Sequence, residues 1–204
     1  MNIRSTTFHL AMIATLQLVI AVAAGAHQRG GGGTHNGIAV PEISHGEMVM
    51  FAEQRDRIID LASRATDTNE PFRRVLNYAQ IQYAYCLWGV APGAVVDEAS
   101  PFNECSHAYL AATKAVLLAM RDMPREAAAA GEMVSLIDAG MVLRGLALIT
   151  CQFSGESFNT ADVIRPSWRG IPTHPASMGA LSGLLALFAT VTFGCRWLLR
   201  RAAP

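Results

Sequence analysis

The 204-residue chain has no formal net charge, and 51% of its residues are apolar while 16% are charged. This composition excludes an intrinsically disordered chain and indicates that part of the chain lies in lipid. Residues 27–176 contain 12 basic and 16 acidic residues, so this region is mildly acidic and has no basic stripe. That charge pattern argues against nucleic-acid binding.

The first 26 residues have the features of a secretory signal peptide. Arg4 gives a short positive start, residues 10–24 are almost all apolar, and Ala24-Gly25-Ala26 has the small residues of a cleavage site. We therefore predict a signal peptide over residues 1–26, cut after Ala26. An uncleaved anchor helix is the alternative, because the apolar stretch is almost long enough to span a bilayer.

Residues 27–43 form a glycine-rich leader that we expect to be flexible. A helix is predicted to follow, because Ser44 and Glu47 have the S-x-x-E spacing of a capping box. Apolar residues then recur at near-helical spacing as far as Ala65, which supports a first helix.

Three more helices are predicted from their start and stop signals. Pro71 begins a second helix that runs to Gly89, and Ser100-Pro101 begins a third that runs to Pro124. The second is apolar around most of its surface, so we expect it to be central, with its aromatic run (residues 78–88) packed in the core.

The fourth helix is predicted over residues 125–151, with three internal glycines that indicate a bend or a close helix contact. No strand pattern of any length is present. The fold class is therefore all-α: a small up-and-down bundle of about four helices over residues 44–151. Residues 152–176 are rich in proline and are expected to form an irregular stalk.

Residues 177–199 are predicted to be a transmembrane helix, because no charged residue occurs from Ser177 to Cys195. Residues 200–204 form a short basic tail that should stay in the cytoplasm, and Arg4 orients the N-terminus in the same way. These signals predict a single-pass protein of the cytoplasmic (inner) membrane with most of its chain on the periplasmic or extracytoplasmic side. A C-terminal sorting signal is an alternative reading of the same helix.

Three cysteines, Cys86, Cys105 and Cys151, fall in the extracytoplasmic region, where thiols tend to be oxidised. In an up-and-down bundle, their positions near helix ends place all three at the same end. We therefore predict one disulfide among them and one remaining thiol, and spacing alone does not choose the pair.

A nucleophilic role for Cys105 with His107 as its base is the competing interpretation of that cysteine. Residues two apart on a helix point about 200° away from each other, so His107 cannot easily activate Cys105. A helix N-terminus lowers a thiol pKa, which keeps an enzyme that uses Cys105 or His107 as an alternative.

A second group of candidate residues is suited to metal binding. Imidazole and thioether groups are copper ligands, and the leader and the first helix supply His27, His35, His45 and Met48. We expect His45 and Met48 to be the fixed half of any site, because they lie one helical turn apart.

The sequence contains no C-x-x-C-H, H-E-x-x-H, G-x-S-x-G or P-loop motif, so it does not imply a particular cofactor. The favoured function is therefore non-enzymatic. We expect a binding or assembly module for another membrane or envelope component, with a protein partner in the envelope. A copper- or other metal-handling protein and a Cys/His-dependent enzyme are the alternatives.

Overall fold

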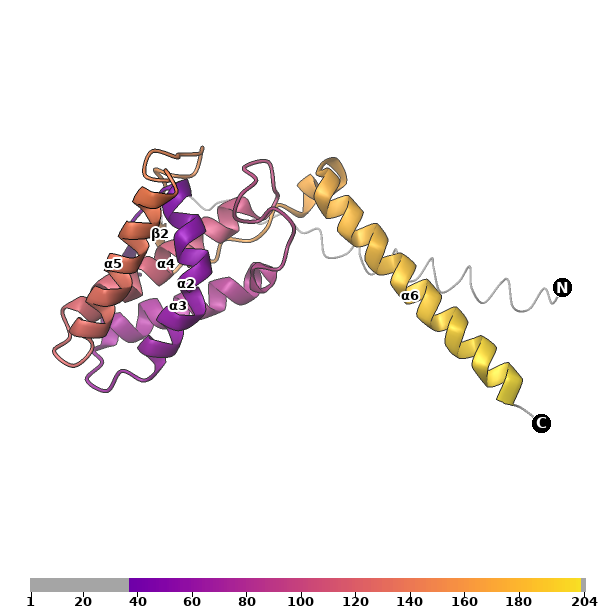
Figure 1. Ribbon diagram of the computed structural model, residues 1–204, viewed down its shortest axis with the longest axis horizontal. Coiled ribbons are helices and arrows are strands. Elements are labelled where there is room, and N and C mark those ends of the chain that lie inside the picture. The colour runs from indigo at the N-terminus through magenta and orange to yellow at the C-terminus, as the bar shows by residue number, and fades with distance from the viewer. Residues whose placement is uncertain (1–36, 203–204) are drawn as a thin grey trace. The chain divides into compact units, whose positions relative to one another are not determined.

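The computed structural model describes residues 37–202, and its described part is mostly helical (Figure 1). Four helices form a bundle: α2 (His45–Ser63), α3 (Glu70–Tyr85), α4 (Asn103–Arg121) and α5 (Ala127–Leu143). Two short 3-10 helices are η1 (Leu87–Gly89) and η2 (Trp168–Thr173), and the last helix is α6 (Pro175–Ala202). The predicted all-α class and helical bundle are confirmed. The predicted signal peptide lies outside the described residues.

A small antiparallel sheet joins the segment before α2 to the segment after α5. Strand β1 (Ala39–Val40) pairs with β2 (Phe158–Asn159), so that Val40 lies opposite Phe158. Both of these residues are buried. The two-residue strands are too short to leave an alternating pattern that a sequence can show.

The predicted capping box is present at the start of α2. The Ser44 hydroxyl accepts from the Glu47 amide at 3.1 Å, and the Glu47 carboxylate accepts from the Ser44 amide at 2.8 Å. These bonds satisfy backbone donors that a helix start otherwise leaves unpaired. They fix the point where α2 begins, and therefore the position of His45.

Helix α4, and not α3 as the sequence analysis expected, is the central helix. It packs against α2, α3 and α5, and 13 of its 19 residues are buried. Small side chains at Ser106, Ala108, Ala111 and Ala112 let the neighbouring helices approach closely. Helix α3 leaves Ile81 and Tyr85 exposed, and Trp88 beyond it is exposed too, so its aromatic run is only partly in the core.

Helix α5 is shorter than predicted, because it ends at Leu143 and not at Cys151. Gly145 has a left-handed φ of 66°, a conformation that commonly terminates a helix. The close contact predicted at an internal glycine is found at Gly140, where an added Cβ would clash with the Met50 side chain. Cys151 therefore lies in an irregular segment that can fold back onto the start of α2.

The segment expected to be a stalk is irregular but packs along the bundle. The Gln82 side chain holds its backbone in both directions, accepting from the Ile164 amide at 3.0 Å and donating to the Ile164 carbonyl. Further on, the Ser167 amide donates to the Pro101 carbonyl at 2.8 Å. The sequence around Gln82, on α3, does not indicate this tertiary contact of its buried side-chain amide.

Helix α6 is long and apolar enough to cross a membrane from Pro175 to Leu198, and its large apolar side chains in this stretch are exposed. The predicted candidate span is thus present as one continuous helix, which begins two residues before the predicted start.

Candidate metal centre

Cys105 and His107, on the first turns of α4, have different partners. Cys105 forms a disulfide with Cys86 at the end of α3, with a Cα–Cα distance of 5.7 Å. His107 lies with its Nε2 3.0 Å from the Sγ of Cys151, which is a free thiol. The structure thus contains one of the predicted pairings, Cys86–Cys105, and leaves Cys151 as a free thiol. Because Cys105 is oxidised, it is not the partner of His107.

A third group joins this thiol and imidazole. His45, the first residue of α2, lies with its ring centroid 6.3 Å from that of His107. One ligand atom from each of His45, His107 and Cys151 lies within 4.8 Å of the others. Three elements far apart in sequence therefore present two imidazoles and one thiol to a common point.

Backbone contacts hold the Cys151 segment against the start of α2. The Gly46 amide donates to the Ile149 carbonyl at 3.1 Å. Gly46 also lies directly against the Leu146 carbonyl, where any Cβ would clash. A side chain at position 46 would thus push the segment carrying Cys151 away from His45.

The Ser154 hydroxyl connects two members of the site. It accepts from the Cys151 amide at 2.8 Å and from the His45 amide at 3.1 Å, and it donates to the Cys151 Sγ at 3.5 Å. The neighbouring Phe153 ring lies 5.8 Å from the His107 ring, which helps to screen the imidazole from water. Ser154 therefore positions Cys151 relative to α2.

Both imidazoles are buried, but their environments differ. Burial, chiefly, and the nearby His45 lower the pKa of His107 to about 4, against a smaller opposing effect of the Ile43 backbone. His107 is consequently neutral at pH 7, and a neutral imidazole has the free lone pair that a metal ligand needs. His45 is 7% exposed, and its Nδ1 is buried without a hydrogen-bond partner among the described residues.

The donor set fits a single transition-metal ion of borderline or soft character. Zinc–nitrogen bonds of about 2.0 Å and zinc–sulfur bonds of about 2.3 Å at tetrahedral angles put nitrogen and sulfur about 3.5 Å apart. The His107–Cys151 distance of 3.0 Å needs only a small widening to reach that value. A site with three protein ligands leaves a coordination position for a water or a substrate.

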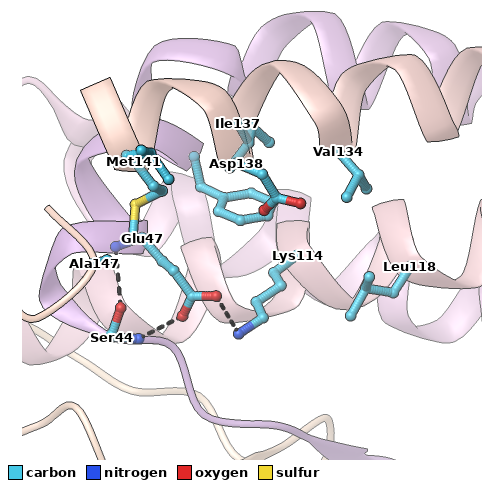
Figure 2. Close-up of a pocket in the computed structure, with 11 residues that line it drawn as sticks. Ser44, Glu47, Lys114, Leu118, Val134, Ile137, Asp138, Met141 and Ala147 are labelled. Atoms are coloured by element: carbon cyan, nitrogen blue, oxygen red, sulfur yellow. Dashed lines mark hydrogen bonds and ion pairs between the residues drawn. The ribbon is translucent and has the colours of Figure 1, made fainter. Parts of the chain in front are cut away.

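A pocket of about 520 Å³ lies on the other side of the α2 start, between α2, α4 and α5. Figure 2 shows Glu47 between Ser44 and Lys114, whose ammonium lies 2.7 Å from the Glu47 carboxylate. The remaining lining is mostly apolar and includes Phe51 and Ile137. Glu47 also belongs to the capping box at the start of α2. Its ion pair with Lys114 therefore helps to fix the position of His45, although neither residue is a candidate metal ligand.

The metal ligands predicted from sequence are only partly those that the structure brings together. His45 belongs to the centre, whereas Met48 is completely buried among core side chains. His27 and His35 lie outside the described residues. His107 and Cys151 are not among the metal ligands predicted from sequence, because no local spacing shows that a segment over 40 residues later returns to α4.

No protein-family model, curated protein or solved structure matches this chain.

Proposed function

We propose that this chain is a membrane-anchored metal-binding protein whose extracytoplasmic domain holds one Cu(I) or Zn(II) ion through His45, His107 and Cys151. The observation that carries this proposal is the convergence of the three ligand atoms within 4.8 Å. The buried Nδ1 of His45 without a described hydrogen-bond partner supports it independently, because a buried polar atom without a partner costs free energy that a bound ion would offset.

The proposed chemistry is binding and exchange of the ion. Cys151 binds as a thiolate, so its proton leaves when the metal enters, while the two histidines bind as neutral imidazoles. The open coordination position allows an incoming ligand from a donor or acceptor molecule to attach before a protein ligand leaves. A protein that passes a metal ion to another molecule needs this order of steps. A site with all four positions filled by protein ligands would oppose the exchange.

The proposed location rests on charge and on the apolar helix α6. Arg200 and Arg201 follow the candidate span, and basic residues flanking a span favour the cytoplasmic side. The domain that precedes the span then lies outside the cytoplasm, in agreement with the Cys86–Cys105 disulfide. The cytoplasmic membrane is the membrane that these signals favour.

A thiol enzyme is the second candidate function, because the Cys151 Sγ lies 3.0 Å from the His107 Nε2. Such a dyad usually depends on an imidazolium that stabilises the thiolate. The lowered pKa of His107 opposes the imidazolium form, which is why metal binding is preferred. The binding or assembly role that the sequence favours, with a protein partner in the envelope, stays a prediction.

Metal titration of the purified full chain in detergent tests the proposal. Co(II) reports a Zn-type site through visible ligand-field bands and a thiolate charge-transfer band, and Cu(I) is measured by competition with a chromogenic chelator. We expect one ion per chain, lost in His45→Ala and retained in His174→Ala. Absence of stoichiometric binding by both metals would overturn the metal-binding function, and alkylation of Cys151 would then test the thiol enzyme.

A further inference from the structure

Exposed apolar side chains lie on two segments that contact each other before α6, the loop between α3 and α4 and the segment of η2. There are four of these side chains, which we call the membrane-proximal surface: Trp88, Val90, Val96 and Trp168, exposed to 60%, 75%, 68% and 53%. Three of them belong to the loop between α3 and α4, and Trp168 begins η2. Four large apolar side chains this exposed need a physical explanation, because monomeric soluble surfaces rarely gather them without a binding role.

The loop between α3 and α4 is held in place by a disulfide and by hydrogen bonds. The Cys86–Cys105 disulfide closes it across a sequence separation of 19. Asn103 donates to the Ala94 carbonyl at 3.3 Å, and Asp97 donates its amide to the Gly93 carbonyl at 2.9 Å. These bonds hold the loop backbone while leaving the two valines exposed.

The backbone at Leu87 and Trp88 is strained, and the indole of Trp88 is exposed. Leu87 and Trp88 have φ values of 53° and 52°, in the left-handed region that non-glycine residues rarely occupy. Such a conformation costs of order 1–3 kcal/mol at each residue and persists where the surrounding structure imposes it. An exposed tryptophan held at this cost is consistent with a contact that the protein itself does not supply.

Contacts between the loop and the segment before α6 tie this surface to the membrane helix. The Nε2 of His174 donates to the Asp97 carboxylate at 2.9 Å, and its Nδ1 lies 2.7 Å from the Ser177 hydroxyl. Trp168 packs edge-on against Phe102, with ring centroids 5.7 Å apart. In Figure 1 the loop between α3 and α4 accordingly lies beside the start of α6.

The length of the candidate span sets the depth of this surface. Pro175–Leu198 contains 24 residues, about 36 Å of helix at 1.5 Å per residue. A hydrocarbon core of about 30 Å is shorter than this, so α6 can span it with its first turn at headgroup level. Asp97, next to Val96, contacts the residue directly before Pro175, and therefore lies at the same level.

We propose that the membrane-proximal surface docks on the headgroup region of the bilayer that α6 spans. Tryptophan prefers this interface because its ring is apolar and its N–H is polar. Exposed Arg169, beside Trp168, adds a cation that suits lipid phosphates. The disulfide then fixes a lipid-contacting loop, and the bundle end that carries it is held against the membrane. This proposal depends on the anchoring by α6 and not on metal binding.

Tryptophan quenching by brominated lipids tests the proposal on the full chain in nanodiscs of phosphatidylcholine and phosphatidylglycerol. The chain has three tryptophans, so Trp168→Phe/Trp197→Phe reports on Trp88, and Trp88→Phe/Trp197→Phe reports on Trp168. Bromine near the top of the acyl chains is expected to quench each reporter by about half, and bromine near the chain ends much less, because interfacial indoles lie at headgroup level.

The control reporter is Leu118→Trp in a background without the three native tryptophans. Position 118 is partly exposed and lies 15 residues along α4 from Asn103, about 22 Å away, so it should not be quenched. Val90→Asp/Val96→Asp should reduce quenching of the Trp168 reporter at least twofold, and Leu118→Asp should not.

Insensitivity of both native reporters to every bromolipid would overturn the proposal, as would unchanged quenching in Val90→Asp/Val96→Asp. Buried emission without lipid quenching would assign the surface to a protein partner or a second copy instead. A chain that does not float with lipid vesicles would overturn the anchoring by α6 as well, and flotation identifies that failure separately.

Discussion

Two cysteines, Cys105 and Cys151, lie on opposite sides of the first turns of α4 and have different roles. On one side Cys105 is completely buried and is bonded to Cys86. On the other, Cys151 is partly exposed and remains a thiol beside His107 and His45. We call these the disulfide side and the metal side. The difference lies in the partner that tertiary structure brings to each position, and not in the local sequence.

The disulfide side is built from neighbouring segments, and the metal side from distant ones. Cys86 and Cys105 are separated by 19 positions and are joined by a single loop. His45 comes from α2, His107 from α4 and Cys151 from the irregular segment after α5, so the metal side forms only when the bundle has folded. Stability should therefore depend mainly on the disulfide side, and metal affinity mainly on the metal side.

The largest expected effect is the loss of the thiol from the metal side. Cys151→Ser should weaken Zn(II) or Cu(I) binding at least 100-fold, because it removes the only anionic ligand of the proposed set. Chelator competition on the purified full chain measures it, and Cys195→Ser is the matched control because Cys195 lies in α6. Equal loss of binding in both variants would show that the loss is not specific to the metal side.

The second effect belongs to the disulfide side. Cys86→Ala/Cys105→Ala should lower the free energy of unfolding by about 3 kcal/mol, the amount expected for a loop of this size. Denaturant unfolding followed by circular dichroism measures it. If the variant is folded, its metal affinity should stay within a few-fold of the natural protein; a collapse of metal binding in a folded variant would show that the two sides are not separate.

A smaller effect is expected from the residue that positions the thiol. Ser154→Ala removes the acceptor of two backbone amides and the donor to the Cys151 sulfur. Metal affinity should fall about 10-fold, as for other groups that orient a ligand. Ser154→Thr keeps the hydroxyl and should restore part of the affinity. If neither variant changes the metal affinity, Ser154 does not position the ligand.

The smallest effect is expected at Met48, which the sequence analysis placed in the metal site. Met48→Leu keeps an apolar side chain of similar volume in the core, so the free energy of unfolding should change by less than about 1.5 kcal/mol. Metal affinity should not change at all. A clear drop in Cu(I) affinity in this variant would instead favour a thioether ligand and the site first expected.

Local signals in the sequence were sufficient for the parts of the fold that depend on short spacing. The Ser44–Glu47 capping box, the candidate span and a disulfide among the cysteines of the bundle were all predicted. The composition of the helices did not show which one is central, because small residues such as Ala108 and Ala111 give a weaker apolar signal than the aromatic residues of α3.

The metal side could not be predicted, because it depends on how the chain returns after α5. Gly145 ends α5 six residues before Cys151, and backbone contacts at Gly46 then seat that segment against α2. Neither event leaves a periodic pattern. The exposure of Trp88 was missed for a related reason, since the left-handed backbone at Leu87 turns the chain away from the helical path.

Mass spectrometry of cysteine alkylation, on full-length protein kept without reductant, tests the division between the two sides most directly. Under denaturing conditions Cys86 and Cys105 should remain unmodified until reductant is added, while Cys151 should be modified fully. Under native conditions Cys151 should react in metal-free protein and be protected by one equivalent of Zn(II). Reaction of Cys151 at the same rate with and without metal, or its recovery in a disulfide, would contradict the account.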